Sequence, residues 1–201
     1  MRDFTAVVKH FDNPRREARW TYDDALALAR PGYPSVILLP NRVAISAFCR
    51  ALADDFGIAG TGPAIEVRDG KALDYREVND HFEFHGMPIR YFGNGIGQLS
   101  DAARRPLVFV MTYHSSKGLD FDAVYMPKLV STMQIVPPHA LLEAPDLDRR
   151  LFFVAMTRSR ERLIMTYSGR RAHPFVEGLP RDAVTFSEYR ETSIEDEDIP
   201  F

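Results

Sequence analysis

The chain has 201 residues, of which 45% are hydrophobic and 26% charged, and its net charge at pH 7 is −3. These values are typical of one soluble domain with a buried core, and they argue against a polybasic coat that wraps duplex DNA. Cys49 is the only cysteine, which excludes an intrachain disulfide and a thiolate zinc cluster. The single cysteine indicates a cytoplasmic protein. No apolar run reaches the roughly 18 residues of a membrane span, so we expect that the chain does not enter a membrane.

Residues 1–34 are weakly patterned, and we interpret them as an N-terminal extension. A strand is predicted at residues 4–11. The sequence TYDD at residues 21–24, followed by ALALAR, is typical of a capped helix start with acidic side chains in its first turn. We expect Pro31 and Gly32 to end that helix.

From residue 35 to residue 170, short apolar runs alternate with helical patterns. Such alternation predicts an α/β domain with a mainly parallel sheet covered on both faces. Residues 57–70 are rich in Gly, Pro and Thr and predict a loop or hairpin. The predicted strands are residues 36–39, 88–92, 107–112, 123–126 and 162–167, and the predicted helices follow residue 41 up to residue 55 and cover residues 74–84, 137–143 and 148–158.

The loop after the predicted strand 107–112 has residues suited to contact a nucleic-acid backbone. Thr112, Ser115 and Ser116 offer hydroxyls, His114 can donate or stack, and Gly118 lets main chain approach closely. In parallel sheets, ligands bind beyond the carboxyl ends of the strands, where this loop begins. The alternative is a solvated turn, and the spacing alone favours that alternative.

Arg158 lies at the end of an apolar helical stripe. Leu151, Val154, Ala155 and Arg158 share one face of the predicted helix, so the guanidinium would be partly desolvated unless an anion meets it. A phosphate fits, because guanidinium binds phosphate oxygens bidentately. Equally, Arg158 could cap helix carbonyls or pair with a carboxylate.

A family resemblance bears on both regions. Residues 112–126 (TYHSSKGLDFDAVYM) are similar to motif V of the UvrD/Rep family of superfamily 1 DNA helicases, and residues 149–158 (RRLFFVAMTR) are similar to its motif VI. The resemblance covers about residues 35–168. It implies that residues 35–170 form the second motor domain of such a helicase, with a RecA-like three-layer fold.

The resemblance also implies roles for single residues. Arg158 is implied to be the arginine finger that reaches the γ-phosphate of ATP, bound with Mg²⁺ by a first motor domain. Asp120 is implied to replace the glutamate that holds the ribose, with Gly118 beside it. The implied contacts to single-stranded DNA are Thr112, His114, Ser115 and Lys117.

The chain departs from the family pattern in three places. Asp120 is one methylene shorter than glutamate, so a ribose contact would need a closer approach. Pro40 stands where the family has an arginine; Arg42 is the candidate substitute in the nucleotide site, and its alternative is a surface arginine. About fifty residues separate the helix ending near residue 55 from motif V, so the large domain that full-length helicases insert there is missing.

No phosphate-binding loop of the Gly-x-x-x-x-Gly-Lys-Ser/Thr type occurs in the sequence. The segment RDGKAL at residues 68–73 lacks both the preceding glycine and the hydroxyl that holds magnesium. We therefore expect that the chain does not hydrolyse ATP alone, and that the ATP-binding half is supplied by another polypeptide or is simply absent from this sequence.

Residues 171–201 are interpreted as a C-terminal extension that ends in a flexible acidic tail, too polar to pack. Its last residues, DEDIPF, resemble the DDDIPF tip of bacterial single-stranded DNA-binding proteins. Phe201 can fill an apolar pocket while acidic side chains steer toward a basic surface. We favour docking to proteins that read such tips over a tail that only solvates the chain; the docking residues are Asp198, Ile199, Pro200 and Phe201.

Two functions follow from the sequence. The first is the C-terminal motor half of a UvrD-like ATP-dependent DNA helicase or translocase. The alternative is a non-catalytic adaptor in DNA repair or replication that recruits partners through its tail.

Overall fold

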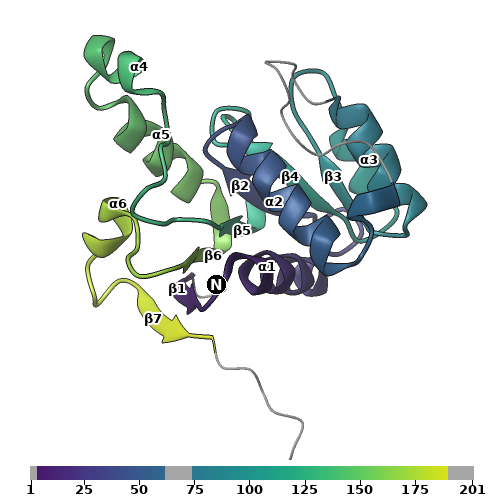
Figure 1. Cartoon of the computed structure of the whole chain (residues 1–201), viewed down its shortest axis with the longest axis horizontal. Helices are drawn as coiled ribbons and strands as arrows, with labels where there is room; N and C mark the ends of the chain where they lie inside the picture. The colour runs from purple at the N-terminus through teal and green to yellow at the C-terminus, as the bar shows by residue number, and fades with distance from the viewer. Residues whose placement is uncertain (1–3, 62–73, 190–201) are drawn as a thin grey trace, which may run out of the picture.

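Seven parallel strands form one sheet in the order β3-β4-β2-β5-β6-β1-β7 (Figure 1). The structure is a computed structural model and describes residues 4–61 and 74–189. The parallel sheet confirms the fold class predicted from the sequence. The strands are β1 (Thr5–Phe11), β2 (Ser35–Leu39), β3 (Ile89–Tyr91), β4 (Val108–Thr112), β5 (Phe121–Met126), β6 (Ser159–Ser168) and β7 (Thr185–Glu188).

Helices cover both faces of the sheet and complete a three-layer α/β fold. On one face α1 to α3 pack over Ile37, Val110 and Tyr125. On the other, α4 to α6 pack with Leu38 and Met111. The helices are α1 (Pro14–Leu28), α2 (Arg42–Asp55), α3 (Tyr75–Phe84), α4 (Pro138–Glu143), α5 (Leu147–Met156) and α6 (Pro174–Glu177), with short 3₁₀ turns η1 (Ala59–Thr61) and η2 (Leu99–Ala102).

The first helix begins earlier than the sequence predicted. We expected a start at residues 21–24, but Asn13 caps α1 by accepting from the backbone N–H of Arg16 at 2.9 Å, and Pro14 occupies the first helical position. Thr21 is therefore buried inside the helix rather than capping it. The helix also ends at Leu28, two residues before the end predicted at Arg30.

Both segments interpreted as extensions contribute strands to the sheet. β1 lies between β6 and β7, and Tyr189 continues this pairing by donating its backbone N–H to the carbonyl of His10 at 2.8 Å. Neither α6 nor β7 was predicted from the sequence. The predicted loop at residues 57–70 lies partly outside the described residues, and the acidic tail at residues 191–201 lies wholly outside them.

Because all strands are parallel, the sheet has two chemically distinct edges. We call the side where the strands end the carboxyl edge and the side where they begin the amino edge. The loop after β4 starts at the carboxyl edge and must return to the amino edge before β5 begins at Phe121. One continuous segment, residues 113–120, therefore visits both edges.

Among the described residues, no helix combines the length and the hydropathy needed to cross a bilayer.

Candidate functional site

At the carboxyl edge, the start of the 113–120 segment is folded by its own hydroxyls. The Thr112 hydroxyl accepts from the backbone N–H of Ser115 at 3.1 Å and donates to Ser115 Oγ at 2.8 Å. Ser116 is fully buried and donates its hydroxyl to the Tyr113 carbonyl at 2.8 Å. His114 and Lys117 are exposed beside them. The structure thus brings together the four residues that the sequence assigned to single-stranded DNA.

A tight hairpin after β3 supports this loop. Gly93 and Ile96 exchange two backbone hydrogen bonds of 3.0 Å, and Asn94 and Gly95 between them both have positive φ, as a type I′ turn requires. Gly93 has φ +146°, and a Cβ added there would lie 3.0 Å from Ser115 Oγ. A glycine is therefore needed for the hairpin to approach Ser115.

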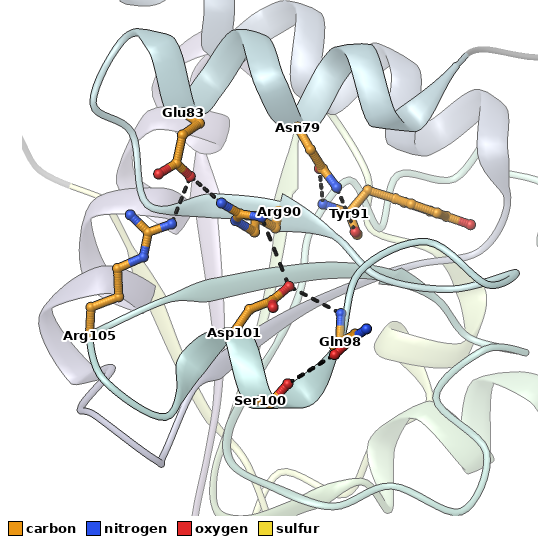
Figure 2. Close-up of polar contacts among 8 residues, drawn as sticks. All are labelled: Asn79, Glu83, Arg90, Tyr91, Gln98, Ser100, Asp101 and Arg105. Atoms are coloured by element: carbon orange, nitrogen blue, oxygen red, sulfur yellow. Dashed lines mark hydrogen bonds and ion pairs between the residues drawn. The ribbon is translucent and has the colours of Figure 1, made fainter.

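Polar contacts anchor both ends of this hairpin (Figure 2). On the β3 side, Asn79 of α3 pairs with the backbone of Tyr91, accepting from its N–H at 2.6 Å and donating to its carbonyl at 3.1 Å. On the other side, Asp101 accepts from the Gln98 backbone N–H at 3.1 Å. Arg90 lies 3.9 Å from Asp101 and also pairs with Glu83, so it links α3 to the turn that follows the hairpin.

Glu83 receives two guanidinium groups, from Arg105 at 2.6 Å and from Arg90. These hydrogen bonds, the one from Arg105 foremost, lower the pKa of Glu83 to about 2. The carboxylate therefore stays charged throughout the physiological pH range.

At the amino edge, the guanidinium of Arg158 is folded back onto its own domain. Its Nε donates to the Val154 carbonyl at 3.0 Å and Nη1 to the Leu119 carbonyl at 3.2 Å. Nη2 donates to Thr157 Oγ1 at 3.2 Å, and the side chain remains 20% exposed. Both alternatives left open for Arg158, capping carbonyls and pairing with a carboxylate, occur in this structure.

Asp120 is the carboxylate partner of Arg158. Its Oδ1 lies 3.4 Å from Nη1 of Arg158, its Oδ2 lies 3.9 Å from Arg160, and its side chain is 48% exposed. A cleft of about 210 Å³ opens next to this ion pair, with Tyr33, Leu99 and Arg160 among its lining residues. Two cations, one carboxylate and a small cleft thus meet at the amino edge, a donor set that fits a phosphate and a sugar hydroxyl.

Gly118 and Arg42, the other two residues assigned to the nucleotide site, do not take part in this ion pair. Gly118 lies two residues before Asp120 with φ +83°, and nothing lies within 4 Å of a Cβ added there. Arg42 begins α2 directly after β2 and therefore lies at the carboxyl edge. The five residues of β2, at roughly 3.3 Å per residue, separate the two edges by about 16 Å, so the structure does not bring Arg42 to Asp120 and Arg158.

Sequence reasoning missed Arg160 and the hairpin. Arg160 is the second residue of β6 and follows Arg158 by two positions, and its side chain reaches Asp120 at 3.9 Å. The Asn94-Gly95 dipeptide is the strongest short signal for a hairpin turn. The docking residues Asp198 to Phe201 lie outside the described residues.

The three-layer α/β fold with its all-parallel sheet agrees with the RecA-like architecture expected from the sequence. A family model described as the UvrD-like helicase C-terminal domain matches residues 94–170, which include the Asn94-Gly95 turn, the 113–120 segment and Arg158. Residues 94–170 are therefore similar to the UvrD-like helicase C-terminal domain. This match confirms the family resemblance found in the sequence.

Similar folds occur among solved structures. The C-terminal domain of a possible DNA helicase from Lactobacillus plantarum superposes with a TM-score of 0.54 and 14% identity, over 92% of this chain and 86% of that one. Domain 2 of the DEAD-box helicase Mss116p, bound to an RNA duplex, gives a TM-score of 0.40 and 17% identity, over 94% of this chain and 65% of that one. The second score is too low to define a shared fold. No curated protein matches the sequence.

Proposed function

We propose that this chain is the C-terminal motor half of a UvrD-like ATP-dependent DNA helicase or translocase. The observation that carries the proposal is the path of residues 113–120, which joins a hydroxyl-rich loop at one edge of the sheet to the Asp120–Arg158 pair at the other. A motor needs such a connection, because it must link nucleotide hydrolysis to movement along DNA.

At the amino edge, Arg158 acts as the arginine finger. ATP with Mg²⁺, held by a first motor domain outside these 201 residues, supplies the phosphoryl group that is transferred. Arg158 leaves Leu119 and Asp120 and directs its guanidinium toward the γ-phosphate, where it neutralises developing negative charge. Asp120 is then free to accept from ribose hydroxyls, and Gly118 permits the loop to adjust.

At the carboxyl edge, Thr112, His114, Ser115 and Lys117 bind the backbone of single-stranded DNA. The Thr112 hydroxyl is already bonded to Ser115, so the Ser115 hydroxyl retains its own proton for a phosphate oxygen. Lys117 adds a cation, and the Gly93 hairpin holds the loop in place.

Reconstitution tests the proposal. The full chain is combined with a polypeptide that carries a phosphate-loop motor domain and copurifies with it from the native host, and DNA-stimulated ATP hydrolysis is measured. Removing an arginine finger slows hydrolysis by about 10³-fold or more, so Arg158→Ala is expected to lose the stimulated rate. Arg76→Ala, on the exposed surface of α3, is the matched control and is expected to keep it. Equal rates for Arg158→Ala and wild type would remove the finger assignment.

A further inference from the structure

A second cationic cleft lies at the carboxyl edge, several strands away from the loop after β4. It encloses about 410 Å³ beside the ends of β6, β1 and β7, and its lining residues include Arg170, Arg171 and Arg181. None of these arginines lies in residues 112–126 or 149–158, which resemble motifs V and VI.

Two of the three arginines that line the cleft are available to bind an anionic ligand. Arg171 lies 3.3 Å from Glu177 and is matched by it. Among the described residues, no carboxylate forms an ion pair with Arg170 or Arg181, both of which are exposed. Glu188 is the other carboxylate in the lining, so the cleft keeps a positive balance.

Aromatic rings accompany these cations. His10 stacks on Tyr167 with ring centroids 4.7 Å apart, and the His10 ring is fixed by a 2.8 Å contact to the Gly169 carbonyl. Arg181 lies 3.9 Å over the ring of Phe186. A basic groove with partly exposed aromatic rings is the combination that binds single-stranded nucleic acid without sequence preference.

The cleft and the loop after β4 lie at the same edge and on the same face of the sheet. Tyr113 of the loop and Tyr167 and Phe186 of the cleft all pack in the cluster that α4 to α6 cover. Three strand spacings separate β4 from β6, about 14 Å at roughly 4.8 Å each. Two polar residues follow the strands between them: Asn41 comes after β2 and donates to the Gln134 carbonyl at 3.0 Å, and Lys128 comes after β5.

We propose that this cleft is a second binding site for the backbone of single-stranded DNA, with Arg170 and Arg181 as its phosphate contacts. The inference rests on the proposed function, because it extends the same DNA path across the carboxyl edge. A strand that leaves Ser115 passes Asn41 and Lys128 and reaches Arg170 beside the His10–Tyr167 stack.

The salt dependence of DNA binding tests this site. Binding of the full chain to a fluorescent oligothymidylate is measured by anisotropy at several salt concentrations. Each phosphate contact to a single strand contributes about 0.7 to the slope of log K against log salt. Arg170→Ala and Arg181→Ala are each expected to reduce the slope by about 0.7. Arg170→Lys keeps a charge and is expected to keep the slope, as is Arg76→Ala on the opposite face.

The outcomes separate the two proposals. Slopes unchanged in both alanine variants, with wild-type binding intact, would overturn the second site and leave the contacts at Ser115 standing. If the wild-type chain does not bind the oligothymidylate even at low salt, the DNA path itself is wrong and both proposals fail.

The acidic residues 191–201 are an alternative occupant of the cleft, and their binding would give a different pattern. Removing those residues would then raise DNA affinity in wild type, while the alanine variants would show unchanged slopes, and this result would also overturn the second site.

Discussion

The two ends of residues 113–120 are held in opposite ways. At the carboxyl edge, the loop is fixed by short and partly buried hydrogen bonds, such as Thr112 to Ser115 at 2.8 Å and Ser116 to Tyr113 at 2.8 Å. At the amino edge, Arg158 meets Asp120 at 3.4 Å and Arg160 meets it at 3.9 Å, around a carboxylate that is 48% exposed. Exposed pairs of this kind contribute little to stability. The loop at the carboxyl edge is thus fixed by short hydrogen bonds, whereas the ion pairs of Asp120 at the amino edge are long.

The largest effect on stability is expected at the Gly93 hairpin. Gly93→Ala should lower the free energy of unfolding by about 2 kcal/mol, because an alanine at φ +146° is strained and its Cβ would press on Ser115 Oγ. Gly95→Ala is the matched control, with φ +77° and open space around it, and should cost about 1 kcal/mol. Urea unfolding followed by circular dichroism measures both. Equal losses would show that the approach to Ser115 is not constrained.

A substitution of Tyr113, in the same loop, is expected to increase the free energy of unfolding rather than lower it. Its hydroxyl is buried without a hydrogen-bond partner among the described residues, and burial raises its pKa well above the ordinary value. Tyr113→Phe should therefore raise the free energy of unfolding by about 1 kcal/mol. Tyr125→Phe is the control, because that hydroxyl donates to Asp24 at 2.6 Å, and its removal should cost about 1 kcal/mol. A destabilised Tyr113→Phe would reveal a partner for the hydroxyl.

Glu83 makes the anchoring of the carboxyl edge dependent on pH. Its pKa is lowered from 4.5 to about 2 in the folded chain, so its contribution is complete above about pH 4.5 and is lost as the pH falls toward 2. Because the side chain is 43% exposed, solvent screening keeps the contribution below about 1 kcal/mol. Glu83→Gln should be less stable than wild type at pH 6, with the gap closing near pH 2. A gap that is constant across urea titrations at pH 6, 4 and 2.5 would contradict the ion-pair account.

The smallest effect is expected at the amino edge. Asp120→Ala removes the partner of two arginines, yet the free energy of unfolding should change by less than about 0.5 kcal/mol, because the contacts are long and exposed. The Arg158 guanidinium keeps its bonds to the carbonyls of Val154 and Leu119. Thermal unfolding is sufficient to measure this, and a loss above 1 kcal/mol would mean that the amino edge is as rigid as the carboxyl edge.

Local patterns predicted most of the sheet and part of the site. Apolar runs located β2, β4, β5 and β6, since strands buried on both faces are continuously apolar. The start of α1 was predicted wrongly, because the acidic residues after Thr21 resemble the first turn of a helix. The N-cap residue is Asn13, which precedes Pro14. β7 was missed because it has four residues and depends on pairing with β1.

The contact between Arg158 and Asp120 could not be predicted from the sequence. The two residues are 38 positions apart, and their meeting depends on how β5 and β6 align in the sheet. The position of Arg42 at the carboxyl edge, away from Asp120, also depends on the sheet. The direction of β2 decides at which edge α2 begins, and the residue type does not. The cationic cleft likewise gathers Arg170 and Arg181 with His10, from the other end of the chain.

We propose that residues 113–120 serve DNA at one edge of the sheet and ATP at the other. In the reconstituted complex, DNA-stimulated ATP hydrolysis is measured against DNA concentration for Arg158→Ala and Ser115→Ala. Arg158→Ala should lose the maximal rate while DNA still half-saturates the residual activity at the wild-type concentration. Ser115→Ala should keep the maximal rate and require more DNA. If both variants alter the same parameter in the same direction, the division between the edges is wrong.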